Sequence, residues 1–429
     1  MDTEMENRGL LRFLTCGSVD DGKSTLIGRL LHDSKAILAD TLQAIESTST
    51  RRGLEALDLS LLTDGLQAER EQGITIDVAY RYFSTGRRKY IIADAPGHEQ
   101  YTRNMVTAAS TAQLAILLVD ARKGLQTQTR RHARLVSMLG IQHQVVAINK
   151  MDLVDHDRAV FERIRDDYLD FAERAGMTGV RFVPMSALRG DMVVERGTGL
   201  GWYDGPTLMD ILESVPVSAA TDAQPLRFPV QWVCRPQEAD NPDLHDYRGF
   251  MGRIESGRIA PGDAVCVLPS GVRTTVEAIH VGGEPRATAS AGQSVTLLLR
   301  DDVDVSRGDM IVSPDTMPQG LRQISADLCW LSDTPLDRAR TYLIRHTTRE
   351  VRAKLMAIDH RLDVNTLEQM PGDRLSMNDI ARVRFKLAQP VFADPYASDR
   401  ATGAFVVIDE STFNTVGAGM IVQDEAADD

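Results

Sequence analysis

The sequence has few cysteines, and their spacing excludes the usual structural uses of thiols. Only four occur in 429 residues: Cys16, Cys234, Cys266 and Cys329. No two form a C-x-x-C pair, and no histidine lies near them at metal-ligand spacing, so neither a zinc site nor a disulfide framework is expected. We interpret the four as core thiols of a protein in a reducing compartment.

Long apolar runs are also missing. No stretch approaches the roughly 18 consecutive apolar residues that a membrane span requires. The first residues, MDTEMENRGL, have neither the basic region nor the apolar region of a secretory signal. We therefore expect a cytoplasmic protein with no membrane association.

An excess of basic residues is absent as well. The 48 Lys and Arg residues are outnumbered by 61 Asp and Glu residues, which gives a formal net charge of −13. This balance disfavours electrostatic attraction to polyanions, so no nucleic-acid partner is expected. A chain of 429 residues is long enough for two or three domains.

Apolar, strand-like runs alternate with longer amphipathic stretches in the first half of the chain. The runs include LLRFLTCG, KYIIADAPG, LAILLVDA, QVVAINK and VRFVPMSAL. Runs of this kind between helical segments are typical of a doubly wound, mostly parallel sheet, whose ligands bind outside the carboxyl ends of the strands. We predict an α/β domain over residues 1–218, with its polar loops converging on one crevice.

The pattern changes after the linker-like segment PVSAATDAQP. Short strand candidates follow, separated by turns such as ESGRIAPGD and VGGEP, and they resume after SPDTMPQGLRQ. We predict two β-barrel domains, over residues 219–315 and 316–429.

The segment GSVDDGKST matches the phosphate-binding pattern G-x-x-x-x-G-K-[ST] between a strand and a helix. Its glycines let backbone N–H groups approach phosphates, its lysine supplies a compact positive charge, and its serine hydroxyl can bind Mg²⁺. A chance glycine turn is the alternative, which the strand-loop-helix context disfavours. The predicted nucleotide-binding residues are Gly17, Ser18, Val19, Asp20, Asp21, Gly22, Lys23, Ser24 and Thr25.

The tetrapeptide NKMD follows the apolar run QVVAI and predicts the base. The carboxylate of Asp152 accepts hydrogen bonds only, so it can take both N–H donors on the Watson–Crick edge of guanine, whereas adenine would leave it unpaired. Alone, such a tetrapeptide is more often a loop or a helix cap. At a strand end downstream of a phosphate loop it predicts guanine binding by Asn149, Lys150, Met151 and Asp152.

Two further loops complete the predicted site. DAPGH supplies an acid for a metal, a glycine for close approach to a terminal phosphate, and a histidine whose alternative is a purely structural role. SAL is weak by itself but lies at another strand end in the expected order. The residues are Asp94, Ala95, Pro96, Gly97 and His98 in the first loop and Ser186, Ala187 and Leu188 in the second. Together these elements predict one site for GTP and Mg²⁺.

The combined motifs GSVDDGKS, GITI, DAPGH, NKMD and SAL resemble those of the translation-factor class of P-loop GTPases. That resemblance implies an α/β P-loop GTPase domain followed by two β-barrels. The chain is more closely similar to the family of GTPase subunits of bacterial sulfate adenylyltransferase. The stretches that carry this likeness are AEREQGITIDVAYRYF, GWYDGPTLMDIL, GFMGRIESGRIAPGD, LIRHTTREVRA and IDESTFNTVGAGMI.

The resemblance implies a role for individual residues. Lys23 would contact the β- and γ-phosphates, Ser24 and Thr75 would bind Mg²⁺, Asp94 would hold the metal through water, and His98 would position the attacking water beside Gly97. The implied catalytic set is His98, Lys23, Thr75 and Gly97. Asn149, Lys150 and Asp152 would hold guanine, with Ser186 and Ala187 behind it, and residues 32–73 would form the first switch.

The two aspartates of the phosphate loop are unusual in a site for anions. The resemblance implies that Asp20 can hold a monovalent cation such as K⁺ against the phosphates. Asp21 stands where elongation factors have a histidine, and we expect a solvated side chain. No arginine finger is evident, so intrinsic hydrolysis should be slow and should wait for a partner or effector.

Two functions fit these motifs. The first is the regulatory GTPase of sulfate activation, in which ATP and sulfate give adenosine 5′-phosphosulfate and pyrophosphate. No second P-loop and no SGG-type pyrophosphatase loop is present, so the ATP chemistry should lie on a separate small catalytic subunit, in a heterodimer or a higher assembly. The second is a translation factor that delivers RNA, which the net charge of −13 disfavours.

Overall fold

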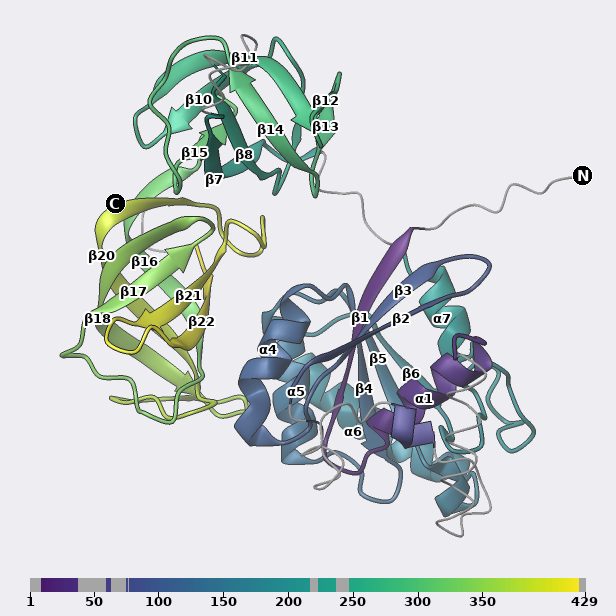
Figure 1. Ribbon diagram of the computed structural model, residues 1–429. Coiled ribbons are helices and arrows are strands. Elements are labelled where there is room, and N and C mark those ends of the chain that lie inside the picture. The colour runs from purple at the N-terminus through teal and green to yellow at the C-terminus, as the bar shows by residue number, and fades with distance from the viewer. Residues whose placement is uncertain are drawn as a thin grey trace, which may run out of the picture. The chain divides into compact units, whose positions relative to one another are not determined.

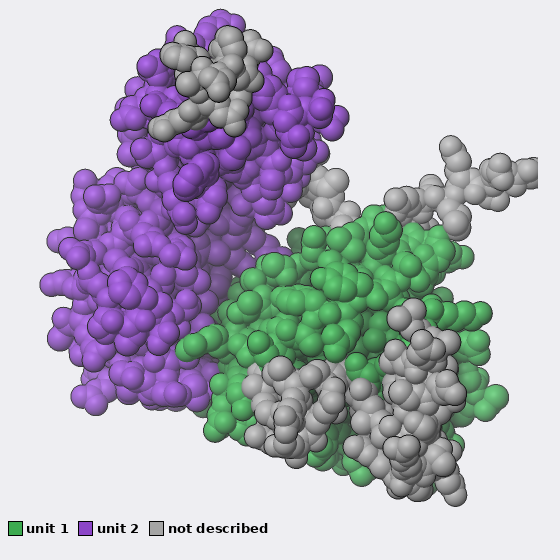
Figure 2. All heavy atoms as spheres, in the orientation of Figure 1, with its two compact units in different colours: residues 1–217, 363–368 green, residues 218–362, 369–429 purple. Residues whose placement is uncertain are grey.

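The computed structural model describes residues 9–37, 59–62, 75, 77–216, 223–236 and 247–423. The chain forms two compact units, residues 1–217 with 363–368 and residues 218–362 with 369–429, which are coloured separately in Figure 2. Most of the predicted first switch, residues 32–73, lies outside the described residues. The predicted boundary between the two β-barrel domains at residue 315 stays a prediction.

The first unit contains a six-stranded sheet in the order β2-β3-β1-β4-β5-β6. Only β2 runs antiparallel to its neighbour, and the other adjacent strands are parallel, which confirms the predicted doubly wound sheet. The central strands are almost entirely buried because helices cover both faces, as their uninterrupted apolar sequences require. The strands are β1 (Leu10–Gly17), β2 (Ala79–Ser84), β3 (Lys89–Asp94), β4 (Leu114–Asp120), β5 (His143–Asn149) and β6 (Val180–Pro184).

Helices flank this sheet, with α4 and α5 on one side and α1 and α7 on the other (Figure 1). Side-chain caps fix where two of them begin: Asp157 accepts a hydrogen bond from Ala159 N at the start of α6, and Thr207 and Asp210 form a reciprocal capping box on α7. Among the described helices, none combines the length and the apolar character that crossing a bilayer requires. The helices are α1 (Lys23–Asp33), α4 (Thr102–Ser110), α5 (Thr127–Met138), α6 (Arg158–Arg174) and α7 (Leu208–Ser214), with 3₁₀ turns η1 (Leu59–Leu62), η2 (Glu99–Tyr101) and η3 (Met151–Val154).

The second unit contains two closed barrels of six antiparallel strands, as predicted. In the first barrel the strand order is β10-β15-β7-β8-β14-β11, and β10 pairs with β11 to close it. Its strands are β7 (Arg227–Cys234), β8 (Gly249–Arg253), β10 (Ala264–Leu268), β11 (Val272–Val281), β14 (Ser294–Leu299) and β15 (Met310–Val312), with short pieces β9 (Arg258–Ile259), β12 (Glu284–Pro285) and β13 (Ala289–Ser290). Buried apolar residues such as Phe228, Phe250 and Leu297 fill its interior.

The second barrel closes in the same way, through the pairing of β17 with β18. Its core contains Trp330, Tyr342 and Phe385, all almost fully buried. Its strands are β16 (Gln319–Trp330), β17 (Tyr342–His346), β18 (Arg349–Leu362), β20 (Ile380–Ala393), β21 (Ala404–Asp409) and β22 (Thr415–Ile421), with the short β19 (Gln369–Met370).

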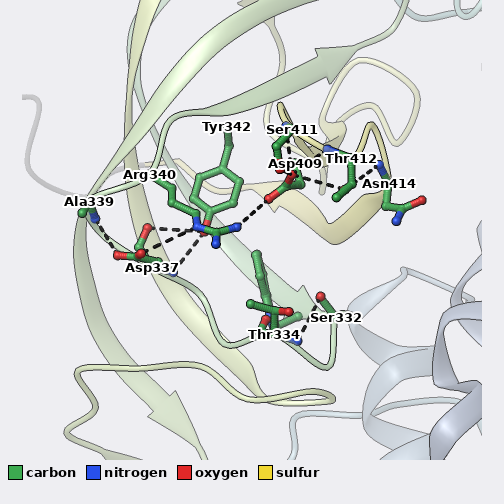
Figure 3. Close-up of polar contacts among 11 residues, drawn as sticks. Ser332, Thr334, Asp337, Ala339, Arg340, Tyr342, Asp409, Ser411, Thr412 and Asn414 are labelled. Atoms are coloured by element: carbon green, nitrogen blue, oxygen red, sulfur yellow. Dashed lines mark hydrogen bonds and ion pairs between the residues drawn. The ribbon is translucent and has the colours of Figure 1, made fainter.

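The IDESTFNTVGAGMI stretch forms the hairpin between β21 and β22, and Figure 3 shows the carboxylate that organises it. Asp409 accepts hydrogen bonds from the backbone N–H groups and the hydroxyls of Ser411 and Thr412, and Arg340 Nη1 lies 3.1 Å from its Oδ2. These bonds, that from Ser411 above all, lower the pKa of Asp409 to about 2. The turn is therefore fixed by a charge that persists at neutral pH.

A buried histidine makes the first unit sensitive to acid. His132 on α5 is 1% exposed, and the amide of Gln128 lies 2.9 Å from its Nε2. Its Nδ1 has no hydrogen-bond partner within the described part of the chain. Burial lowers the pKa of His132 to about 3, with Lys23 and Arg131 contributing in the same direction. The folded protein therefore keeps this ring neutral.

Replacing His132 with leucine should reduce the loss of unfolding free energy that the protein suffers as the pH falls. The unfolded chain takes up a proton below pH 6.5 while the folded chain does so only near pH 3, so this residue's contribution to stability is lost as the pH falls through that window. Between pH 6.5 and pH 5 the parent should lose about 2 kcal/mol that His132→Leu retains. Urea unfolding of both proteins at pH 7 and pH 5 measures the difference, and equal acid losses in the two proteins would contradict it.

Candidate nucleotide-binding site

The loops that carry the predicted motifs follow neighbouring parallel strands of the first unit. The register pairs Thr15 of β1 with Asp94 of β3, and Asp120 of β4 with Asn149 of β5. Because the strands are parallel and in step, their carboxyl ends meet at one edge of the sheet. The sequence expectation that these polar loops converge is confirmed.

A cavity of about 500 Å³ opens at this edge. It brings together residues from the phosphate loop, the strand-end loops and Thr75, which were predicted separately. Two cationic side chains in its wall were not predicted. The lining residues are Val19, Asp20, Gly22, Lys23, Ser24, Thr25, Thr75, Gly97, Arg122, Lys123 and Lys150.

The phosphate loop has the backbone that its glycines allow. Gly22 adopts φ 95° at the start of α1, and a Cβ there would lie 2.5 Å from Asn149 Nδ2, so only glycine fits. Lys23 is 7% exposed, and its Nζ donates to the carbonyls of Gly17 at 3.0 Å and Ser18 at 2.9 Å. Burial lowers the pKa of Lys23, and the carboxylates of Asp94 and Asp21 oppose that shift. A lysine held at a helix N-terminus in a cavity fits the phosphates of a nucleotide.

The expectation of a solvated Asp21 is wrong. Its side chain is 1% exposed, and Oδ2 accepts a hydrogen bond from Ser18 N at 2.6 Å. Its main-chain carbonyl accepts from Asn149 Nδ2 at 2.8 Å. Burial raises the pKa of Asp21 to about 6, against the lowering effect of Lys23 and Ser18 N–H. Asp21 is therefore an internal anchor of the phosphate loop, whereas Asp20 is exposed and lines the cavity.

The DAPGH loop packs directly against the phosphate loop. A Cβ on Gly97 would lie 2.4 Å from Lys23 Nζ and 2.7 Å from the Gly17 carbonyl oxygen, so the close approach requires glycine. Asp94 is 2% exposed, and Thr15 Oγ1 donates to its Oδ1 at 3.4 Å. His98 is half-buried at the N-cap of η2, where its Nδ1 accepts from Gln100 N at 3.3 Å. Ala95 and Pro96 of the same loop are buried.

The NKMD loop is tied to both neighbouring loops through one amide side chain. Asn149 is 2% exposed; its Nδ2 donates to the Asp21 carbonyl, and its Oδ1 accepts from Ala187 N at 2.9 Å. Lys150 adopts φ 63°, and its Nζ donates to the Asp20 carbonyl and lies 2.9 Å from Asp120 Oδ2. The side chain of Asp152 is 5% exposed.

One oxygen of this loop lacks a hydrogen-bond partner among the residues that the structure describes. Asp152 Oδ1 is buried and makes no hydrogen bond to any described residue, while Arg189 Nε is 3.8 Å from Oδ2. A buried acceptor without a donor is costly, and the N–H groups of a guanine edge would satisfy it. Met151, next to Asp152, is fully buried beneath the loop.

The SAL loop is positioned from two sides. Ser186 is fully buried, and its hydroxyl accepts from Arg189 N at 3.2 Å. Arg29 of α1 donates to the carbonyls of Ala187 and Leu188. The side chain of Leu188 is 51% exposed and turns away from the core.

Sequence reasoning missed Asp120 and the residues after it. The side chain of Asp120 is fully buried. It accepts hydrogen bonds from Arg122 Nε at 3.0 Å and from Arg122 Nη2 at 2.7 Å. Arg122 and Lys123 line the cavity. A signal was present, because DARK directly follows the apolar run LAILLV and therefore lies at a strand end like the other motifs.

The first 217 residues define a class of protein. Residues 8–217 match the family described as "Elongation factor Tu GTP binding domain", and residues 323–422 match "GTP-eEF1A C-terminal domain-like". The chain is a GTPase of this class, which uses GTP and Mg²⁺. A solved structure of sup35 complexed with GDP aligns with 99% of this chain and 97% of its own, at 24% identity and a TM-score of 0.44.

Curated relatives narrow the class to one family. A protein of Alteromonas mediterranea named "Sulfate adenylyltransferase subunit 1" is 52% identical over 99% of this chain and 89% of its own length. Proteins of the same name from Laribacter hongkongensis and Cellvibrio japonicus are 53% and 54% identical, over 97% of this chain and 86% and 88% of theirs. The chain belongs to the sulfate adenylyltransferase subunit 1 family.

The anchor role of Asp21 can be tested without nucleotide. Asp21→Ala leaves Ser18 N–H without its acceptor and should lower the free energy of unfolding by about 1–3 kcal/mol. Asp21→Asn keeps an acceptor oxygen at the same place and should lose much less. Urea unfolding of the nucleotide-free protein measures the stability of both variants. An Asp21→Ala variant as stable as the parent would contradict the role of Asp21 in holding the phosphate loop.

Proposed function

We propose that this chain is the GTP-hydrolysing regulatory subunit of a sulfate adenylyltransferase. It couples GTP hydrolysis to the formation of adenosine 5′-phosphosulfate and pyrophosphate from ATP and sulfate on a partner subunit. The observation that carries this proposal is the identity of 52–54% over nearly the whole chain to relatives named for that enzyme. Formation of the phosphosulfate anhydride has a strongly unfavourable free energy, so coupling it to GTP hydrolysis would drive the reaction forward.

Specific residues would perform the GTP chemistry. Lys23 would exchange its bonds to loop carbonyls for the β- and γ-phosphates, and Gly97 would allow the DAPGH backbone to approach the terminal phosphate. Ser24, Thr75 and Asp94 would hold Mg²⁺, which neutralises phosphate charge when bound. The cavity containing Lys23, Ser24, Thr75 and Gly97 supports these assignments.

His98 would orient the water that attacks the γ-phosphate. Its Nδ1 accepts from the backbone at the N-cap of η2, which leaves Nε2 as the nitrogen that carries the proton and can point toward a ligand. Since the sequence shows no arginine finger, we infer that ordering of His98 for hydrolysis awaits a partner or effector.

Asp20 would hold a monovalent cation such as K⁺ against the phosphates. Its backbone adopts φ 69°, and Lys150 is bound to its carbonyl. This arrangement leaves the exposed carboxylate at the cavity wall. A cation there would screen its charge from the nucleotide.

The adenylyl transfer itself would lie on a small catalytic subunit of the ATP pyrophosphatase type. The sequence has one P-loop and no SGG-type loop, which supports a division of labour in a heterodimer or a higher assembly of heterodimers. The net charge of −13 supports the absence of nucleic acid among its partners.

Base specificity is assigned to Asp152. Asp152→Asn places an amide donor opposite a donor of guanine, so GTP should bind roughly 100-fold more weakly and xanthosine triphosphate correspondingly better. Asp155→Asn is the matched control, because Asp155 is exposed and its φ of 53° suits asparagine, and it should bind GTP like the parent. Calorimetry with both nucleotides measures the exchange, and unchanged GTP affinity in Asp152→Asn would refute the assignment.

Reconstitution with the candidate small subunit tests the proposed reaction. Sulfate-dependent pyrophosphate release from ATP and GTP turnover should rise together when the two proteins are mixed. Lys23→Ala, which loses the phosphate contact, should abolish both increases. Pyrophosphate release that is indifferent to GTP, or copurification of RNA instead of a small protein subunit, would count against the proposal.

A further inference from the structure

The nucleotide cavity contains an arginine that no recognised motif assigns. Arg122 lies in the loop after β4 and lines the cavity together with Lys23, Ser24 and Thr75. The side chain is 46% exposed, so its guanidinium is open to the cavity and not packed into the core.

A buried carboxylate fixes the orientation of this arginine. Asp120 Oδ1 accepts from Arg122 N and Nε, both at 3.0 Å, and Oδ2 accepts from Nη2 at 2.7 Å. The Asp120 carbonyl accepts from Lys123 N and Gly124 N, which closes the loop on itself. One edge of the guanidinium is therefore held, while Nη1 makes no hydrogen bond to any described residue.

The charge balance around Asp120 favours an anion. Lys150 Nζ also binds Oδ2 at 2.9 Å, so two cations share one carboxylate. Burial opposes the charge of Asp120, but the hydrogen bonds from Arg122 and Lys150 outweigh it and hold its pKa well below the usual range. The carboxylate thus stays ionised and keeps both cations in place. Among the lining residues, the cations of Lys23, Arg122, Lys123 and Lys150 outnumber the carboxylate of Asp20, so the wall carries a net positive charge. A polyphosphate is the ligand that this charge suits.

We propose that Arg122 is a phosphate-binding residue supplied in cis, whose free Nη1 edge contacts the phosphate chain of the bound guanine nucleotide. The inference rests on the proposed GTP-binding function of the cavity and adds to it a residue outside the P-loop, DAPGH and NKMD motifs. In the competing arrangement Arg122 only supports Asp120, and through it the base loop at Lys150.

The number of phosphates on the ligand separates these two roles. The full chain and its Arg122→Ala and Arg122→Lys variants are titrated with guanosine, GDP and the non-hydrolysable analogue GMPPNP, using competition against a fluorescent GDP. Arg122→Ala should weaken GDP and GMPPNP by roughly 10- to 100-fold and leave guanosine unchanged. Arg122→Lys keeps the charge but not the planar fork, so it should show a smaller loss with the same dependence on phosphate.

Arg158→Ala is the matched control, because Arg158 begins α6 in the same unit and, within the described part of the chain, pairs with Glu162 on its own helix and lies outside the cavity lining. It should bind all three ligands like the parent. If Arg122→Ala does not fold, as judged by thermal unfolding, Arg122→Lys carries the test alone.

Equal losses for guanosine and GDP in the Arg122 variants overturn the proposal in favour of support for the base loop, and no loss for any ligand overturns it as well. A parent protein that binds none of the guanine ligands removes the proposed function itself. That outcome is distinct, because it appears before any variant is compared.

Discussion

The site depends on one buried amide. Asn149 joins three loops that are far apart in sequence: it donates to the carbonyl of Asp21 in the phosphate loop and accepts from the N–H of Ala187 in the SAL loop. Both of its partners are main-chain groups, so the amide fixes backbone positions and not merely side chains. The requirement for glycine at Gly22 follows from the same contact, because a Cβ would collide with this amide at 2.5 Å. Asn149 therefore fixes the backbone of the loops that surround the cavity.

Around that amide, the charges are arranged so that buried carboxylates keep cations in position. Asp21 and Asp94 act on Lys23, and Asp120 is shared by Lys150 and Arg122. A buried lysine without such neighbours would tend to lose its proton, because burial disfavours the charged form. Negative residues beside a phosphate cavity are thus consistent with anion binding: they keep the lysine charged and the loop anchored.

Those features of the site that depend on short sequence patterns could be predicted from the sequence. The doubly wound sheet follows from apolar periodicity, and the structure confirms it. The convergence of the phosphate, DAPGH and NKMD loops follows from their positions at strand ends, and residues of all three line one cavity. The role of Asp21 was not readable, because its burial depends on how the loop folds over the end of β1. Arg122 was missed for a different reason, since an arginine in a charged tetrapeptide has the appearance of a solvated surface residue. Only the parallel register, which brings β4 beside β1 and β5, places that tetrapeptide at the cavity.

Lys150 links the NKMD loop to the phosphate loop. It follows Asn149 in the base loop, yet its ammonium group binds the Asp20 carbonyl of the phosphate loop and the carboxylate that also holds Arg122. A displacement of the NKMD backbone therefore moves a cation shared with the phosphate loop. Under the proposed reading of guanine by Asp152, a wrong base would leave this carboxylate unsatisfied in the loop that also carries the shared cation. The NKMD motif in this chain thus connects the loops around the cavity through the hydrogen bonds of Asn149 and Lys150.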